Sequence, residues 1–178
     1  MFSRLIAMAL LAATLIAQQA DEYNVKAAFL YNFAKFVDWP AESFLNPTGP
    51  LTICVLGEDP FDRALDEFVA GKTIGGRPFA VRRVSDFRQT GACQMLFVGS
   101  SANKRALSFL AADRQPGVLT VGDTELAASE GLIIRFTMVN GRVHFEIDAP
   151  AASRAGLHIS AKLLSLAQAD RRPEGIAK

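Results

Sequence analysis

The chain has 178 residues, half of them hydrophobic, with 19 Lys and Arg against 18 Asp and Glu. This length and apolar content are those of one globular domain with a true core. The balanced charge provides no clustered cations for phosphate groups, which excludes nucleic acid as an expected partner.

The N-terminal segment has the pattern of a secretory signal peptide. Arg4 precedes an apolar run over residues 5–17, and Ala20 precedes the polar pair Asp21-Glu22. The run is shorter than the roughly 20 apolar residues that span a bilayer. We expect residues 1–20 to be a signal peptide cut after Ala20 and residues 21–178 to be one exported domain. A retained membrane anchor and a buried N-terminal helix are the alternatives.

Residues 21–38 have the periodicity of an amphipathic helix. Large apolar side chains recur every three or four residues and form one broad face: Val25, Phe29, Leu30, Phe33, Phe36 and Val37. Trp39-Pro40 ends the helix, since the residue before a proline disfavours helical geometry. We expect the apolar face to pack on a sheet, and any interaction surface to lie on the Tyr31 and Trp39 side.

Three apolar runs that end in glycine indicate a parallel sheet. Each run is followed by a polar turn, and the runs cover residues 51–56, 95–98 and 118–121. The first two precede helix-like stretches over residues 61–69 and 102–111, with Asp59 and Ser100 or Ser101 as candidate caps. Strands that alternate with helices predict parallel pairing with right-handed crossovers.

Residues 78–84, between the first two of these runs, follow a Gly-Gly turn and read as a strand. The later part of the chain changes character, and Asn140-Gly141 between residues 132–139 and 142–147 is a strong hairpin signal. Two short helices are expected over residues 149–155 and 160–169. The predicted fold is therefore α/β, a mostly parallel sheet with flanking helices, finished by an antiparallel C-terminal hairpin and two short helices.

Cys54 and Cys93 are the two cysteines of the chain. Both lie in or beside apolar runs that neighbouring strands could bring within bridging distance. Export makes a structural disulfide the expected state, whereas in the cytosol the pair would be free core thiols. Metal binding is the rival interpretation, but His144 and His158 lie too far downstream for the spacing of a zinc site.

The carboxyl ends of parallel strands form the usual ligand crevice of such sheets. The residues expected there are Gly57, Glu58, Asp59, Gly99, Ser100, Ser101 and Asp123. No nucleotide-binding glycine motif and no nucleophile elbow occurs, and tight strand-to-helix turns explain the glycines. His144 and His158 have no marked nucleophile beside them. We expect no enzymatic activity, no cofactor and no metal; small-molecule binding at this crevice is the alternative function.

Several stretches together resemble the YfiR-type periplasmic regulators. The most specific are the first helix ending in Trp39-Pro40 and the block Gly141-Arg142-Val143-His144; the glycine turns and Cys93 before residues 96–98 also agree. The resemblance extends over nearly the whole chain after residue 20. It implies a disulfide between Cys54 and Cys93. A second cysteine pair that some members carry is absent, so redox control through a second bridge is not expected.

The resemblance also implies a function. It describes a soluble periplasmic repressor, typically dimeric, that binds an inner-membrane diguanylate cyclase and lowers cyclic-di-GMP synthesis and biofilm formation. Another membrane sensor protein is the alternative partner, because the family is broad. An outer-membrane OmpA-like lipoprotein sequesters such repressors. A repressor of this kind needs a folded surface rather than catalytic residues. We expect that surface on two polar groups of side chains: Arg142, His144 and Glu146 of the last strand, then Arg154, His158 and Lys162.

Overall fold

The computed structural model describes residues 2–99, 116–123 and 131–169, and their side chains over residues 19–167. The helix expected over residues 102–111 and the caps expected at Ser100 and Ser101 lie outside the described residues.

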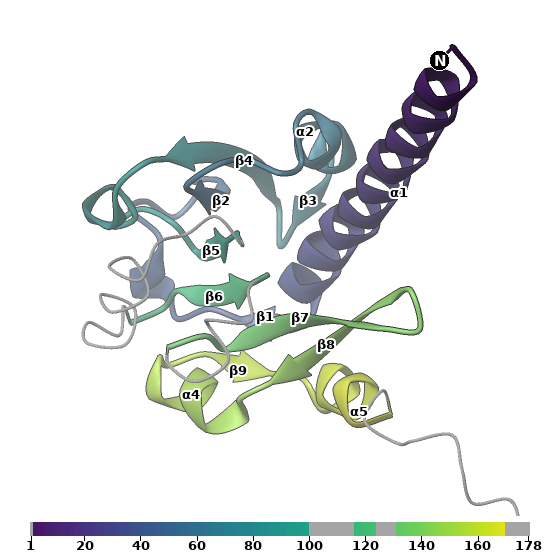
Figure 1. The fold of residues 1–178 in the computed structure, drawn as a ribbon. Coiled ribbons are helices and arrows are strands. Elements are labelled where there is room, and N and C mark those ends of the chain that lie inside the picture. Colours follow the sequence, from purple (N-terminus) through teal and green to yellow (C-terminus); the bar gives the residue numbers. More distant parts are fainter. Residues whose placement is uncertain (1, 100–115, 124–130, 170–178) are drawn as a thin grey trace, which may run out of the picture.

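A seven-stranded sheet is the centre of the fold (Figure 1), and its spatial order is β3-β4-β2-β5-β6-β7-β8. The strands are β2 (Leu51–Leu56), β3 (Thr73–Ile74), β4 (Arg77–Val84), β5 (Met95–Val98), β6 (Leu119–Gly122), β7 (Ile134–Val139) and β8 (Arg142–Ile147). The five strands from β4 to β7 are parallel, and antiparallel β3 and β8 form the two edges. The predicted α/β fold class is confirmed.

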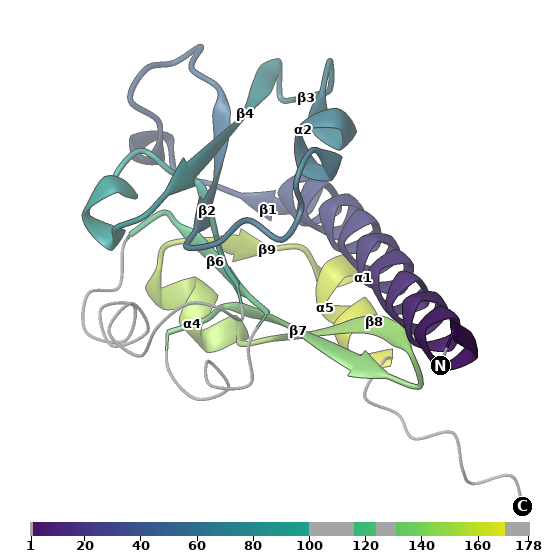
Figure 2. The same cartoon turned by 45° about the horizontal axis from the view of Figure 1, so that its top comes forward.

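Helices cover one side of this sheet. In Figures 1 and 2 the same side carries α2 (Ala64–Val69), α1 (Phe2–Lys35) and α5 (Ala161–Ala169). A single hydrophobic cluster joins these helices to the sheet through residues such as Phe33, Leu65 and Leu163. The helix α4 (Ala149–Arg154) follows β8, and short 3-10 helices occur at Ala41–Ser43 and Phe87–Gln89.

The other side of the sheet carries a smaller apolar cluster. Its members are Cys54, Leu56, Val84, Phe87, Cys93, Leu96, Val98, Val118 and Leu132. Consecutive residues of β2 thus pack into different clusters, Ile53 and Val55 on the helix side and Cys54 and Leu56 on the other. Burial on both faces explains why this strand is apolar at every position but Thr52.

The first helix ends earlier than its periodicity predicts. Helix α1 stops at Lys35, and Val37–Asp38 forms strand β1, which pairs antiparallel with β9 (His158–Ile159). The predicted apolar face is otherwise buried against the sheet, through residues such as Leu30 and Phe33, but Val25 is 45% exposed, whereas Ala27 and Ala34 are fully buried. Small side chains let the helix approach the sheet closely, so the prediction from large apolar residues was wrong for Val25.

The hairpin at Asn140-Gly141 is confirmed. Asn140 and Gly141 both have positive φ, 50° and 73°, as a type I′ turn requires. Its register pairs Phe136 with Phe145 and Thr137 with His144. Phe136 and Phe145 therefore face α1, where both rings contact Phe29 and Phe33.

Other element boundaries differ by a few residues. Helix α2 begins at Ala64 instead of residue 61, because Asp59 holds the backbone N–H of Phe61 in a preceding turn at 2.8 Å. The two C-terminal helices are confirmed; Asp148 caps α4 through the N–H of Ala151, and Ser160 accepts from Leu163 at the start of α5.

Candidate functional site

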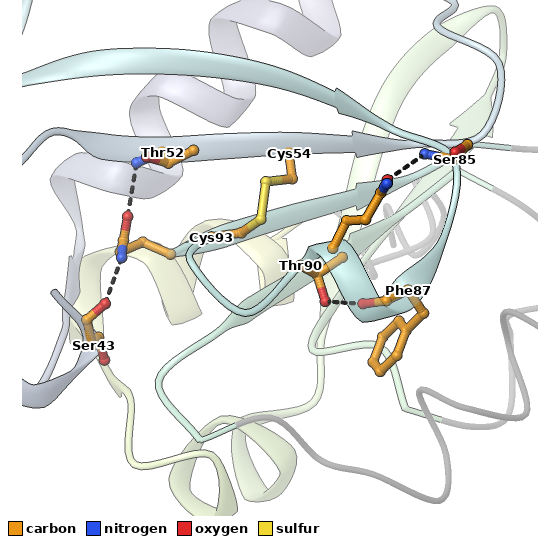
Figure 3. Close-up of a disulfide and its surroundings, with 9 residues drawn as sticks. Ser43, Thr52, Cys54, Ser85, Phe87, Thr90 and Cys93 are labelled. Atoms are coloured by element: carbon orange, nitrogen blue, oxygen red, sulfur yellow. Dashed lines mark hydrogen bonds between the residues drawn. A yellow bond between two sulfur atoms is a disulfide. The ribbon is translucent and has the colours of Figure 1, made fainter. Parts of the chain in front are cut away.

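The disulfide joins Cys54 in β2 to Cys93, just before β5 (Figure 3), with Cα atoms 5.8 Å apart. Both residues are buried in the smaller apolar cluster. The prediction that adjacent strands bring them together is confirmed, since β2 and β5 are hydrogen-bonded neighbours. The strand order reverses at β2, which has β4 on one side and β5 on the other, and the disulfide joins β2 to the β5 side of this reversal.

Gln94 connects this bridge to the segment that follows α1. Its side-chain oxygen accepts from the N–H of Thr52 at 2.8 Å, and its amide donates to the carbonyl of Ser43. The indole N–H of Trp39 donates to the backbone carbonyl of Gln94 at 2.9 Å. The Trp39 indole thus forms its hydrogen bond within the fold. Sequence reasoning missed Gln94, although a polar residue inside the apolar run over residues 93–98 indicates a buried side chain that needs hydrogen-bond partners.

The crevice residues at the carboxyl ends of the strands contact other parts of the domain. Asp59 is held by Arg83 at 2.7 Å, and Asp123 is held by Lys26 and by the hydroxyl of Tyr23, each at 2.7 Å. Gly57 and Glu58 are exposed and Gly99 is buried, while Ser100 and Ser101 lie outside the described residues. Small-molecule binding there stays a prediction, to be tested by thermal shift.

The buried Lys26 is a feature that the sequence interpretation missed. Its side chain is 1% exposed, forms ion pairs with Glu22 and Asp123, and lies 4.5 Å from the centre of the Tyr23 ring. Lys26 lies on the buried stripe of α1, next to Ala27 and one turn before Leu30. A lysine on the buried stripe of a helix is the sequence signal that could have identified Lys26 as a buried, paired residue. The cluster fixes α1 to the end of β6.

A second ionic cluster fixes α2 to β4. The Arg83 guanidinium binds Asp59, Asp66 and the carbonyl of Asp62. Its hydrogen bonds lower the pKa of the Asp66 carboxyl below the ordinary value, and the same contacts raise the pKa of Arg83. The arrangement is structural, since it neutralises the arginine within the domain.

The residues predicted to bind a partner fall into two groups. On β8, Arg142 is exposed, His144 is half-buried opposite Thr137, and Glu146 forms an ion pair with Arg135. These side chains share the face of the hairpin that points away from α1, beside Val139, which is 43% exposed.

The second group is dispersed over α4, β9 and α5. Arg154 lies 4.0 Å from Asp148, His158 lies 3.3 Å from Asp38, and the Lys162 amine lies 5.3 Å from the centre of the Phe36 ring. All three residues are exposed. The structure therefore gathers the β8 residues on one face but does not join all six into one contact cluster.

Two other kinds of site are absent from the described ranges. There, no set of three or more His, Cys, Asp or Glu side chains is arranged to hold a metal ion. In the same part of the chain, no helix combines the length and the hydropathy needed to cross a bilayer.

Comparison with known proteins identifies the family. A search of curated proteins found no significant match. The model of the YfiR/HmsC-like family matches residues 23–168, so the match begins at Tyr23, the first buried residue of α1 whose side chain is described, and ends in α5. The match extends over most of the chain and confirms the resemblance seen in the sequence. The chain belongs to the YfiR/HmsC-like family.

Proposed function

We propose that the chain is a periplasmic, non-enzymatic regulator that binds an inner-membrane signalling protein, a diguanylate cyclase, and represses it. The observation that carries this proposal is the family match over residues 23–168. Repression lowers cyclic-di-GMP and biofilm formation. It requires only a surface that binds one state of the target more tightly than another.

The polar face of the β7–β8 hairpin is our candidate for that surface. Arg142, His144 and Val139 offer charged, imidazole and apolar contacts on two paired strands, whose phenylalanines pack against α1 on the other face. Arg154, His158 and Lys162 form a second candidate contact. Homodimerisation and sequestration by an OmpA-like outer-membrane lipoprotein belong to the same proposal.

Deletion and complementation test the function. Deleting the gene is expected to raise cellular cyclic-di-GMP and biofilm, and the wild-type chain to restore both to their original levels. Arg142→Glu is expected to fail in complementation while it folds normally, since Arg142 is exposed. Arg88→Glu is the matched control, because Arg88 is also exposed and lies in a different element. Unchanged cyclic-di-GMP after deletion would refute the proposal.

We also propose that signal peptidase cuts after Ala20, leaving residues 21–178 as one domain in the periplasm. Gln19, Ala20 and Asp21 are exposed, and the buried part of α1 begins at Tyr23. A cut after Ala20 thus removes none of the described core. Mass spectrometry of the exported protein should find Asp21 as the first residue; a retained Met1 would favour a membrane anchor.

A further inference from the structure

Among the described residues, nothing pairs with the outer edge of β4 over most of its length. On one side, β2 pairs with β4 from Phe79 to Val84. On the other side, within the part of the chain that the structure describes, β3 pairs only with Arg77 and Pro78. An unpaired strand edge is a template for another extended segment.

Three residues of β4 direct their backbone groups outward. The carbonyl of Val84 accepts from the N–H of Gly57, at the end of β2, so Val84 faces β2. Backbone direction alternates along a strand, so Phe79, Val81 and Arg83 direct their N–H and C=O groups away from β2. These residues offer donors and acceptors repeated at about 7 Å, the two-residue repeat of a strand.

A cavity lies directly beside this edge. Its volume is about 230 Å³, and its wall includes Val69, Lys72, Phe79 and Val81. This is smaller than the roughly 300–1,000 Å³ of small-molecule sites, and it suits a single inserted side chain. The side chains of Phe79 and Val81 belong to the helix-side cluster. A strand added in register would therefore place every second side chain toward the cavity.

The side chains near the outer edge of β4 carry an excess of positive charge, which indicates what kind of segment can bind there. Lys72 and Arg77 donate to backbone carbonyls, Arg82 is exposed, and no described carboxylate forms an ion pair with any of the three. Arg83 alone is neutralised, by Asp59 and Asp66. A second copy of β4 would bring a second set of these cations to the same edge, and this net positive charge disfavours pairing between copies of the chain. An acidic strand is complementary.

We propose that the outer edge of β4 receives an extended acidic segment of another protein as an added strand. One apolar side chain of that segment enters the cavity beside Val69 and Phe79, and an adjacent acidic side chain meets Arg82 on the opposite face of the sheet. This recognition surface is separate from the β8 face and does not depend on which membrane protein is regulated.

Amide hydrogen exchange tests whether the edge is open in the full exported chain. The amides of Val81 and Arg83 are expected to exchange at least roughly tenfold faster than those of Arg82 and Val84. Equal protection at all four residues would overturn the proposal, because the edge would then be covered. If that protection disappears on dilution to the monomer, the occupant is a second copy of the chain.

A synthetic peptide of alternating Asp and Leu tests the occupant. Its binding is expected to protect the Val81 and Arg83 amides. Only every second residue of an added strand directs its N–H toward β4. Of two peptides, one N-methylated at all Leu residues and the other at all Asp residues, one is therefore expected to lose binding and the other to keep it. Arg82→Glu should weaken this peptide roughly tenfold and favour one with Lys in place of Asp. Equal binding of both N-methylated peptides, or no effect of Arg82→Glu, would overturn the proposal.

Discussion

The two ends of the central sheet are held together by different chemistry. Around the start of β5, the disulfide from Cys93 to the middle of β2 and the neutral hydrogen bonds of Gln94 join these two strands. At the carboxyl end, ion pairs of Lys26 and Arg83 join the helices to the strands. Salt and acid weaken ion pairs, whereas a buried disulfide responds to reductants. The stability of one end of the sheet thus depends on salt and pH, and that of the other end depends on the redox state of the disulfide.

The largest expected effect is loss of the disulfide. Cys54→Ser or Cys93→Ser should lower the free energy of unfolding by about 4 kcal/mol, because the bridge closes a long loop, with its cysteines 39 residues apart. The double variant should cost about the same as either single one. Denaturant unfolding with and without reductant measures the effect; free thiols in the exported protein would contradict the bridge.

Breaking the Lys26 cluster should cost somewhat less. Asp123→Asn leaves a buried ammonium with only Glu22 as an ionic partner, which should cost about 3 kcal/mol. The double variant Lys26→Met with Asp123→Asn should be more stable than Asp123→Asn alone, because no buried charge remains. Asp38→Asn is the control: its carboxylate is exposed, so the expected change is below about 1 kcal/mol. A double variant less stable than Asp123→Asn would contradict this.

At the amino end, Gln94→Ala should cost about 2 kcal/mol, since it leaves the buried N–H of Thr52 without its acceptor. Gln89→Ala is the matched control, because Gln89 is exposed and accepts one bond from Ser85. Thermal unfolding at low and high salt sharpens the comparison. The cost of Gln94→Ala should be independent of salt, and a salt-dependent cost would argue against a neutral contact.

The smallest effect concerns Asp66 and pH. Arg83 lowers the pKa of Asp66 in the folded state below the ordinary value of 3.8. A lowered pKa stabilises the fold above the unfolded value, and this contribution is lost as pH falls through the folded value. Asp66→Asn should therefore cost less than about 1 kcal/mol at pH 7, because the pair is partly exposed, and the difference should vanish in acid. Urea unfolding from pH 7 to pH 2 measures it.

Local patterns predicted much of this fold. Asn140-Gly141 predicted a type I′ hairpin because both positions need positive φ, and the apolar runs that end in glycine predicted parallel strands. The patterns failed where a distant segment intervened. Val37 and Asp38 continue the helical periodicity, yet they pair with Ile159 and His158. The sequence identified the residues of the predicted crevice but not their contacts. Asp59 and Asp123 form ion pairs with residues distant in the sequence, which no local pattern predicts.

The sequence by itself determined the signal-like N-terminus, the family resemblance, the hairpin and the identity of the bridging cysteines. These depend on residue type and on neighbours along the chain. Only the tertiary structure decided the strand order, the burial of Lys26 and the open edge of β4. Lys26 and Asp123 are 97 residues apart, and their contact exists only once helix α1 lies across the end of β6. Which edge remains free likewise follows from how all the strands pair together.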